Sequence, residues 1–454
     1  PLEGADEYQH IAFIQYILEN QKLPVFGQSN VPKSIYSDLL ANPHCKHGWD
    51  QTSRIGCLHY SNFYETSPTP DISNEIFMYQ AQHPPLYYLI AAPVYHFVYQ
   101  NFGFLTGVYS LRILNIMIGG IGLLFMLAPL KYVIHDRNLR IATALAATLS
   151  PVYLVNVSRV ANDPLAILLA GISVWLLTHL FRRHYPIRMT FFAGVFVGLG
   201  LLAKMIALSV FAAGFVFLVF LPVWRKNTSL KKTFSLTMSF LTGCLLISTP
   251  LFLHSISTYG VLILSQETIA LERSGSTIFD LIRTAANFQS IVYFIQFKLF
   301  GGTLWRSGWS SLMPNSIFFI SYACLLFLSF CGAIVWFIKA ALNRSKVLSQ
   351  CNPLLFFCML IVMATAAAAY SHGVNTILAF GKMITPGYYV MIAYPAFIIC
   401  LAFANKAFGT KIAIGILWAL IALFVITELY SLWFIAVPHW SATDSLSEAL
   451  QRLQ

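Results

Sequence analysis

Charged residues are scarce in this chain. Only 10% of its 454 residues are charged, while 57% are hydrophobic, and the mean hydropathy is +0.69. A soluble domain carries about 25% charged residues. This shortage excludes an ordinary soluble protein, and the sequence predicts an all-α polytopic membrane protein.

Acidic residues are scarcer than basic ones, 17 against 28, which gives a net charge of +11. Such an excess could indicate nucleic-acid binding, but no nucleic-acid motif is visible. Fifteen of the basic residues fall in five short gaps between apolar runs, and these gaps hold one acid, Asp136. Basic residues gather in the cytoplasmic loops of membrane proteins. The pattern therefore predicts cytoplasmic gaps and no nucleic-acid partner.

The apolar runs predict about ten membrane spans, each close to the roughly 20 residues that a bilayer needs. Residues 190–222 are flanked on both sides by basic clusters, so this stretch is expected to cross twice, with Lys204 near its apex facing protein or water. The Tyr-rich run 83–99 is expected to lie along the surface. The single spans are predicted at 111–130, 139–157, 163–181, 233–253, 314–338, 353–370, 384–404 and 411–434.

This arrangement places the N-terminal segment outside. The chain also lacks a methionine at its first position, Pro1, so we expect one further N-terminal span in the parent protein, eleven in all. The predicted parts are a first extracytoplasmic loop with juxtamembrane helices at 1–110, a transmembrane core at 111–253, an extracytoplasmic loop at 254–313, C-terminal transmembrane helices at 314–434 and an extracytoplasmic tail at 435–454.

Two of the eight cysteines lie in the polar segment 1–82. Cys45 and Cys57 have His44, His47 and His59 close by. Outside the cytoplasm the two cysteines are expected to form a disulfide that closes a short loop. A zinc site from the same residues is the alternative, although the spacing matches no standard finger.

The first ten residues carry three carboxylates and a histidine ahead of a largely apolar chain. Asp6 and Glu7 are adjacent, so on a helix their side chains diverge by roughly 100°, while His10 shares a face with each. One carboxylate could then act as a base while its neighbour orients a ligand. The alternative is a solvated helix start with acids placed for the helix dipole.

The predicted outer face collects the remaining unusual polar residues. Structural alternatives exist for three of them: Asp163 before Pro164 suits a helix N-cap, Lys382 suits an interfacial lysine, and His83 suits a turn. The candidate site residues on this face are Asp6, Glu7, His10, His83, Arg159, Asn162, Asp163, Lys204, Arg306 and Lys382.

The order of these motifs resembles the GT-C class of membrane glycosyltransferases, which includes protein O-mannosyltransferases and the lipid A aminoarabinose transferase. Finer details are similar to a bacterial branch of uncharacterised GT-C-like proteins. In that branch the last motif is more often Gly-Arg, so the role of Lys382 stays open. The matching motifs are Asp6-Glu7, His83-Pro84-Pro85-Leu86, Arg159 with Asn162-Asp163-Pro164, Trp305 to Trp309, and Gly381-Lys382.

The resemblance implies a GT-C-like helical bundle in the bacterial inner membrane with an extracytoplasmic active site. It implies an inverting glycosyltransferase that moves a sugar from a polyprenyl-phosphate carrier to a hydroxyl of a glycan, lipid or protein. Asp6 would be the base, with Glu7 positioning the acceptor or assisting. Lys204, Arg159, Arg306 and Lys382 would stabilise the departing phosphate. No cofactor is required by these residues, although a divalent metal is compatible with them.

Two other classes of protein share some of these features. A polysaccharide polymerase or ligase also uses lipid-linked glycans, but would be expected to act through Arg and His in later loops. A transporter also places charges within its spans, but it should show paired repeats with interrupted helices. Apart from 190–222, the sequence shows no such symmetry, and its carboxylates lie in a loop.

Overall fold

The computed structural model describes residues 6–35, 38, 76–180, 187–224, 229–296, 304, 314–342, 352–385, 387–437 and 447. Within these ranges the chain is helical or irregular, and the only strand-like pairing is an isolated bridge between Asn30 and Phe77. The predicted all-α class is confirmed. Cys45, Cys57 and Arg306 lie outside the described residues, so the predictions that concern them stay predictions.

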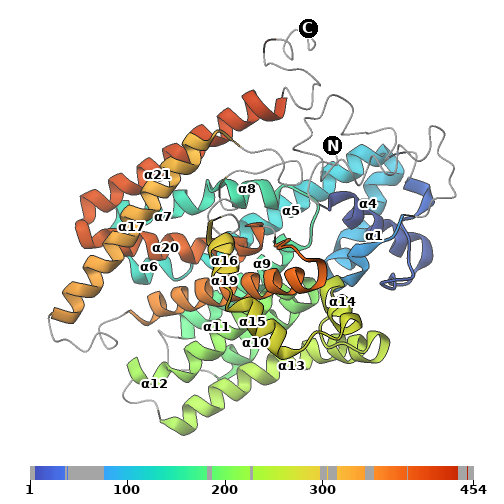
Figure 1. Cartoon of the computed structure of the whole chain (residues 1–454), viewed down its shortest axis with the longest axis horizontal. Helices are drawn as coiled ribbons and strands as arrows, with labels where there is room; N and C mark the ends of the chain where they lie inside the picture. Colours follow the sequence, from blue (N-terminus) through green and yellow to red (C-terminus); the bar gives the residue numbers. More distant parts are fainter. Residues whose placement is uncertain are drawn as a thin grey trace.

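The helices follow one another with short connections, and Figure 1 shows α17, α20 and α21 gathered on one side of the molecule and α1 and α4 on the other. The α-helices are α1 (Glu7–Asn20), α4 (Leu86–Phe102), α5 (Phe104–Met126), α6 (Leu130–Val133), α7 (Arg137–Thr148), α8 (Pro151–Val157), α9 (Asp163–Leu180), α10 (Ile187–Ala203), α11 (Leu208–Val219), α12 (Leu221–Trp224), α13 (Leu230–Tyr259), α14 (Gln266–Ser274), α15 (Ile278–Ala285), α16 (Phe288–Tyr293), α17 (Ser316–Leu342), α19 (Pro353–Phe380), α20 (Tyr394–Asn405) and α21 (Thr410–Ser431). Shorter turns are η1 (Lys33–Ile35), η3 (Tyr79–Gln82), η4 (Met205–Ala207), η6 (Gly387–Ala393), η7 (Lys406–Phe408) and η8 (Leu432–Ala436).

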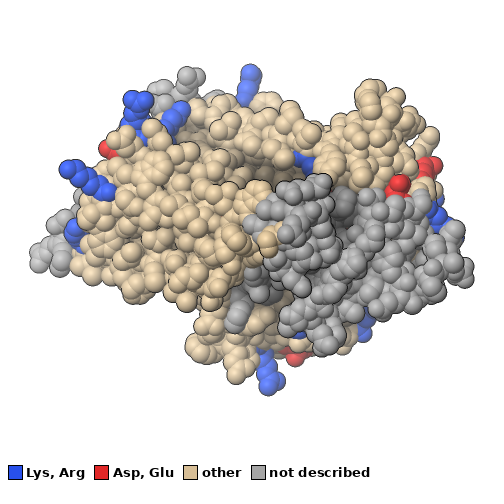
Figure 2. All heavy atoms as spheres, turned by 90° about the horizontal axis from the view of Figure 1, so that it is seen from above, with Lys and Arg blue, Asp and Glu red and all other residues tan. Residues whose placement is uncertain are grey.

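Helices occur in each of the nine ranges for which the ten spans are predicted. In the part of the chain that the structure describes, seven helices are long and apolar enough to cross a membrane. An eighth span results if α7 and α8, which meet at a bend of 48°, are counted together. Over 190–222 the structure has two shorter apolar helices, α10 and α11, separated by a break at Lys204. They are not among the seven candidate spans, so the double crossing stays a prediction. The face in Figure 2 shows few charged side chains, as expected of a membrane protein.

Two of the long helices continue beyond their predicted ends. α13 has 30 residues and reaches Tyr259, and α19 has 28 residues and reaches Phe380. At 1.5 Å per residue these helices are about 45 and 42 Å long, whereas the hydrocarbon core of a bilayer is about 30 Å thick. Each helix therefore extends beyond the hydrocarbon on at least one side. The predicted loop 254–313 is largely helical where it is described, because α14, α15 and α16 follow α13.

Glycines let α10 and α13 approach closely. A Cβ atom on Gly194 would collide with the carbonyl oxygen of Phe240, and one on Gly243 would collide with that of Phe191. One turn further along α10, a Cβ on Gly198 would lie 2.8 Å from the carbonyl oxygen of Cys244. Small residues at such spacing are typical of helix pairs within membranes, where close backbone packing supplies the attraction.

The buried apolar residues form two main cores. The larger core runs from the end of α5 to α21 and includes Phe217, Phe240 and Phe357. The smaller core joins α1, α4, the start of α5 and the start of α9, with Tyr87 and Tyr88 at its centre. α4, predicted as a surface helix, has 17 residues and is not among the candidate spans. The candidate site lies beside the smaller core.

Candidate functional site

An aspartate with two cations stands at the centre of the site. Lys204 Nζ lies 2.8 and 2.9 Å from the two carboxylate oxygens of Asp163, and Arg159 Nη2 lies 3.1 Å from Oδ2 of the same carboxylate. All three side chains are buried. Asp163 is the first residue of α9, but its carboxylate binds the two cations rather than capping the helix. The Asp163 side chain is therefore explained by these two ion pairs and not by the alternative of a helix N-cap.

Two breaks between helices bring these residues together. α8 ends at Val157 and α9 begins with Asp163-Pro164, so Arg159 lies in the bend between them. Lys204 adopts extended backbone angles between α10 and η4. The Asn162 side chain donates a 2.8 Å hydrogen bond to the carbonyl oxygen of Ala203, which fixes one break against the other. Lys204 thus faces protein, as predicted.

Tyrosine rings cover the two cations. The guanidinium carbon of Arg159 lies 4.0 Å from the centre of the Tyr388 ring. Lys204 Nζ lies 5.7 Å from that ring and 5.5 Å from the ring of Tyr389. Cations within about 6 Å of an aromatic centre are stabilised by the electrons of the ring. The rings therefore help to keep two positive groups in a buried site.

Two histidines stand next to the cations. The rings of His10 and His83 stack with their centres 6.1 Å apart and their planes 4° from parallel. His10 Nδ1 shares a 2.8 Å hydrogen bond with the Tyr88 hydroxyl. Burial, followed by the charge of Lys204, lowers the pKa of His83 to about 3. Burial also lowers the pKa of His10 well below its usual value. Both rings are therefore neutral at neutral pH.

Asp6 precedes α1 with unusual backbone angles. Its φ of 60° and ψ of 7° are left-handed, a conformation that costs free energy in a residue with a side chain. Asp6 is half-buried, and the Tyr79 hydroxyl donates a hydrogen bond to its Oδ1. It is close enough to Arg159 and Lys204 to interact electrostatically with both. Strained residues of this kind cluster at functional sites.

Glu7 has a different environment from Asp6. Its side chain is fully buried, and Arg112 on α5 donates to both carboxylate oxygens at 2.8 and 2.6 Å. The backbone N–H of Val160 donates a further hydrogen bond of 2.9 Å. Glu7 thus joins α1 to α5 and to the bend that carries Arg159. Three donors on one carboxylate suit an anchor better than a base.

Seven of the ten predicted site residues meet here. They are Asp6, His10, His83, Arg159, Asn162, Asp163 and Lys204. Glu7 lies behind them as an anchor. Lys382 is exposed just after α19, and none of the ion pairs of the described residues joins it to Asp163. Arg306 is outside the described residues.

The sequence did not point to several other residues around the site. Arg112 carries a charge within an apolar run, and this could have marked it as a residue with an acidic partner. Glu267 on α14 lies 3.6 Å from His372 on α19, and the His372 ring meets Tyr389 edge to face at 4.9 Å. These residues come together only in three dimensions, because they lie far apart in the sequence.

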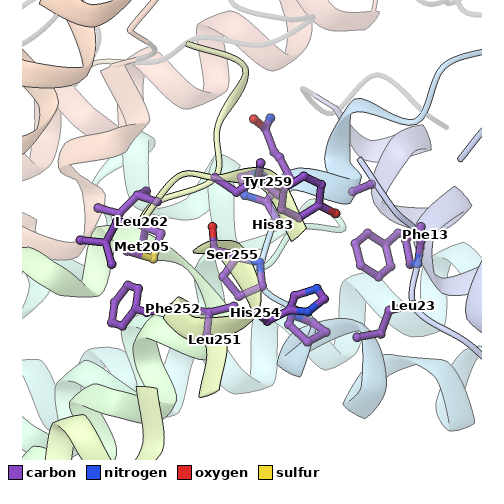
Figure 3. A pocket seen from close by; sticks show the side chains of 17 residues that line it. Phe13, Leu23, His83, Met205, Leu251, Phe252, His254, Ser255, Tyr259 and Leu262 are labelled. Atoms are coloured by element: carbon purple, nitrogen blue, oxygen red, sulfur yellow. The ribbon is translucent and has the colours of Figure 1, made fainter. Parts of the chain in front are cut away.

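A small, partly open apolar cavity of about 70 Å³ lies beside His83. It is lined by α1, the segment 81–85, η4, the end of α13 and residues 262–264. Figure 3 shows His83, His254, Ser255 and Tyr259 around it, with Phe13 and Leu23 on one side and Met205 and Leu262 on the other. His83 of the site lines this cavity, as does Met205, which directly follows Lys204 in the chain. Among the described residues no group of three or more His, Cys, Asp or Glu could hold a metal ion.

A sequence comparison relates part of this site to a known family. Residues 82–254 match the model of the family described as dolichyl-phosphate-mannose-protein mannosyltransferase. The matched segment contains His83, Arg159, Asn162, Asp163 and Lys204. No curated protein sequence matches the chain.

Two solved structures are similar to this one. The oligosaccharyltransferase of Archaeoglobus fulgidus, in its apo form, matches with a TM-score of 0.50 and 12% identity over 98% of this chain and 53% of that protein. ArnT from Cupriavidus metallidurans, bound to undecaprenyl phosphate, matches with a TM-score of 0.44 and 13% identity over 86% of this chain and 61% of ArnT. The chain thus spans about half to three fifths of their lengths.

The match to the oligosaccharyltransferase and the apolar helices agree on the architecture. The chain is a multi-pass membrane protein with a GT-C type helical fold, as the motifs predicted. At 12% identity the likeness concerns the fold, and the chemistry has to be argued from the site itself.

Proposed function

We propose that this chain is an inverting GT-C glycosyltransferase that moves a sugar from a polyprenyl-phosphate carrier to an acceptor hydroxyl at the extracytoplasmic face of the membrane. The observation that carries this proposal is the meeting of a half-buried carboxylate, Asp6, with two buried cations, Arg159 and Lys204. The family description of the matched segment names a dolichyl-phosphate sugar, which supports a lipid-linked donor.

The two cations suit the leaving group. When the bond between the anomeric carbon and the phosphate oxygen breaks, the carrier phosphate gains one negative charge. Arg159 and Lys204 are fixed by Asp163 before the substrate binds, so little reorganisation is needed at the moment of reaction. Preorganised positive groups of this kind stabilise developing charge in an active site.

Asp6 suits the acceptor. An acceptor hydroxyl attacks the anomeric carbon on the face opposite to the phosphate, and its proton passes to the Asp6 carboxylate. One bond forms as the other breaks, so the configuration at the anomeric carbon inverts. A base of this kind contributes about 10²- to 10⁴-fold in rate. His10 and His83, which are neutral at neutral pH, can hydrogen-bond to sugar hydroxyls without adding charge.

The cavity suits the carrier. Apolar residues such as Phe13, Leu251 and Leu262 line it, and so does His83, which interacts electrostatically with Lys204. A molecule with an anionic head and an apolar tail is complementary to such a site, because its phosphate can meet the cations while its hydrocarbon leaves water.

The test uses the purified chain in liposomes with a panel of radiolabelled polyprenyl-phosphate sugars. Cell membranes supply acceptors in one arm, and water is the only acceptor in the other. The proposal expects release of the unlabelled polyprenyl phosphate with transfer of label from at least one donor. A polymerase would instead use a diphosphate-linked glycan, and a transporter would move label across the bilayer without cleaving it. Either result would overturn the proposal, as would no cleavage of any donor by the folded protein.

A further inference from the structure

α15 exposes an apolar side that no described part of the chain covers. Ile278, Phe279 and Ile282 are 70%, 78% and 58% exposed. The helix has eight residues and is capped by Thr277, which exchanges hydrogen bonds with Asp280. Isolated helices of this length are unstable in water. An amphipathic helix with its apolar side open therefore needs a partner for that side.

The two sides of α15 differ sharply in character. At 100° per residue, Ile278, Phe279 and Ile282 fall within about 100° of the helix circumference. Asp280 occupies the opposite side, and Arg283 lies at the edge between the two, about 40° from Phe279. This separation is the pattern of a helix that lies in a membrane interface, with its polar side in water and its apolar side at the boundary of the acyl chains.

Hydrogen bonding holds α15 to a defined level of α19. The Tyr370 hydroxyl donates a 2.7 Å hydrogen bond to the carbonyl oxygen of Ala285 at the end of α15. Tyr370 lies 17 residues after the start of α19 at Pro353, which corresponds to about 26 Å along the helix axis. The hydrocarbon core is about 30 Å thick. α15 is therefore attached close to the level at which α19 leaves the hydrocarbon.

The exposed residues of α19 also place α15 at the edge of the membrane. Met359 and Met363 are exposed one turn apart, and Ser371, two turns further, is exposed beside Tyr370. α14 and α15 pack against α19, and Figure 1 shows them beside it. The apolar side of α15 thus adjoins a surface that a membrane-spanning helix presents to lipid. This continuity favours the bilayer over a second protein as the occupant.

We propose that α15 is an interfacial membrane helix, with Ile278, Phe279 and Ile282 immersed at the acyl boundary of a phospholipid bilayer. α14 precedes α15 directly and carries Glu267, which lies beside His372, and the backbone N–H of Gln266 donates to the Gln82 side chain next to His83. Lipid contact at α15 therefore also supports the segment that borders the candidate site. The inference does not depend on the proposed enzymatic activity.

The experiment places a small environment-sensitive fluorescent amino acid at Phe279 or at the exposed Asp280 of the full chain in liposomes. A probe at Leu246, an exposed residue within α13, serves as the control for lipid contact. Quenching is measured with brominated phospholipid and, separately, with aqueous iodide. A probe at Ile278 provides a second variant on the apolar side if the Phe279 variant does not fold.

The proposal expects brominated lipid to quench the Phe279 probe several-fold more strongly than the Asp280 probe, at a level comparable to Leu246. Iodide should show the opposite order. If iodide quenches the Phe279 and Asp280 probes equally, α15 lies in water and the proposal is wrong. If neither quencher reaches the Phe279 probe, a protein surface covers the helix, and the proposal is equally wrong.

Discussion

At the scale of single residues, Asp163 is the group that permits two cations to be buried side by side. It accepts hydrogen bonds from Lys204 and Arg159 together. Removing one partner of a buried ion pair leaves an uncompensated charge and typically costs about 3–5 kcal/mol. Replacing both partners by neutral groups of similar size costs much less.

Asp163→Asn is therefore expected to lower the free energy of unfolding by about 3 kcal/mol. Addition of Lys204→Met to the same chain should restore part of this loss, because one buried cation is removed as well. Thermal unfolding in detergent of the two single variants, the double variant and the parent provides the measurement. Additive losses in the double variant would show that the two residues do not form a stabilising pair.

Lys204→Met by itself is expected to weaken binding of the donor. The apolar stem remains, but a charge-assisted contact worth about 1.5–3 kcal/mol is lost, so the dissociation constant for polyprenyl phosphate should rise by about 10- to 100-fold. Lys411→Met, at an exposed lysine on α21, is the matched control. If the parent, Lys204→Met and Lys411→Met bind polyprenyl phosphate with equal affinity, Lys204 does not contact the phosphate.

At the scale of secondary-structure elements, Arg112 anchors α1 to α5. It holds both oxygens of Glu7, which is buried in the first turn of α1. Arg112→Met should leave the Glu7 carboxylate without its cation and loosen α1, because a buried charge has lost its partner. Hydrogen exchange should then become faster in α1 and change little in α13. Arg137→Met, at an exposed arginine, provides the control, and unchanged protection of α1 would contradict the anchoring role.

The sequence predicted the helices well where hydrophobicity alone determines them. Apolar runs located each candidate span among the described residues, and the basic flanks of 190–222 are matched by two apolar helices that meet near Lys204. Hydropathy did not predict the extensions of α13 and α19, because the last turns of both helices lie outside the apolar runs. Helix propensity and packing, rather than hydropathy, continue these helices.

The sequence anticipated which residues would lie close together for seven of the ten candidates, but it did not anticipate how they pair. The expected side of the membrane gathered Asp6, His83, Asp163 and Lys204 in one group. The Asp163–Lys204 contact joins residues 41 positions apart, and no local spacing rule reaches that far. The separate environments of Asp6 and Glu7 were also beyond the sequence, because they depend on Arg112 and on the backbone of Val160.

At the scale of the whole molecule, two buried histidines connect stability to pH. Burial lowers the pKa of His83 to about 3 and that of His10 well below 6.5. Below about pH 6.5 the unfolded chain binds protons at these positions and the folded chain does not, so stability is lost as the pH falls. Each histidine contributes up to about 1.4 kcal/mol per pH unit.

The melting temperature in detergent is therefore expected to fall between pH 6.5 and pH 5, a window above the usual pKa of carboxylates. His83→Asn should flatten this dependence, whereas His96→Gln, at an exposed position on α4, should leave it unchanged. The same slope in the parent and in His83→Asn would show that His83 is protonated in the folded chain.

The central claim is that Asp6 takes the acceptor proton in a site where cations hold the carrier phosphate. Single-turnover sugar transfer by Asp6→Asn, measured with donor binding in one lipid system, tests it most directly. The substitution keeps the size of the side chain and removes its charge. Donor binding should stay at the parent level while transfer slows by about two to four powers of ten. Transfer at close to the parent rate would contradict the claim.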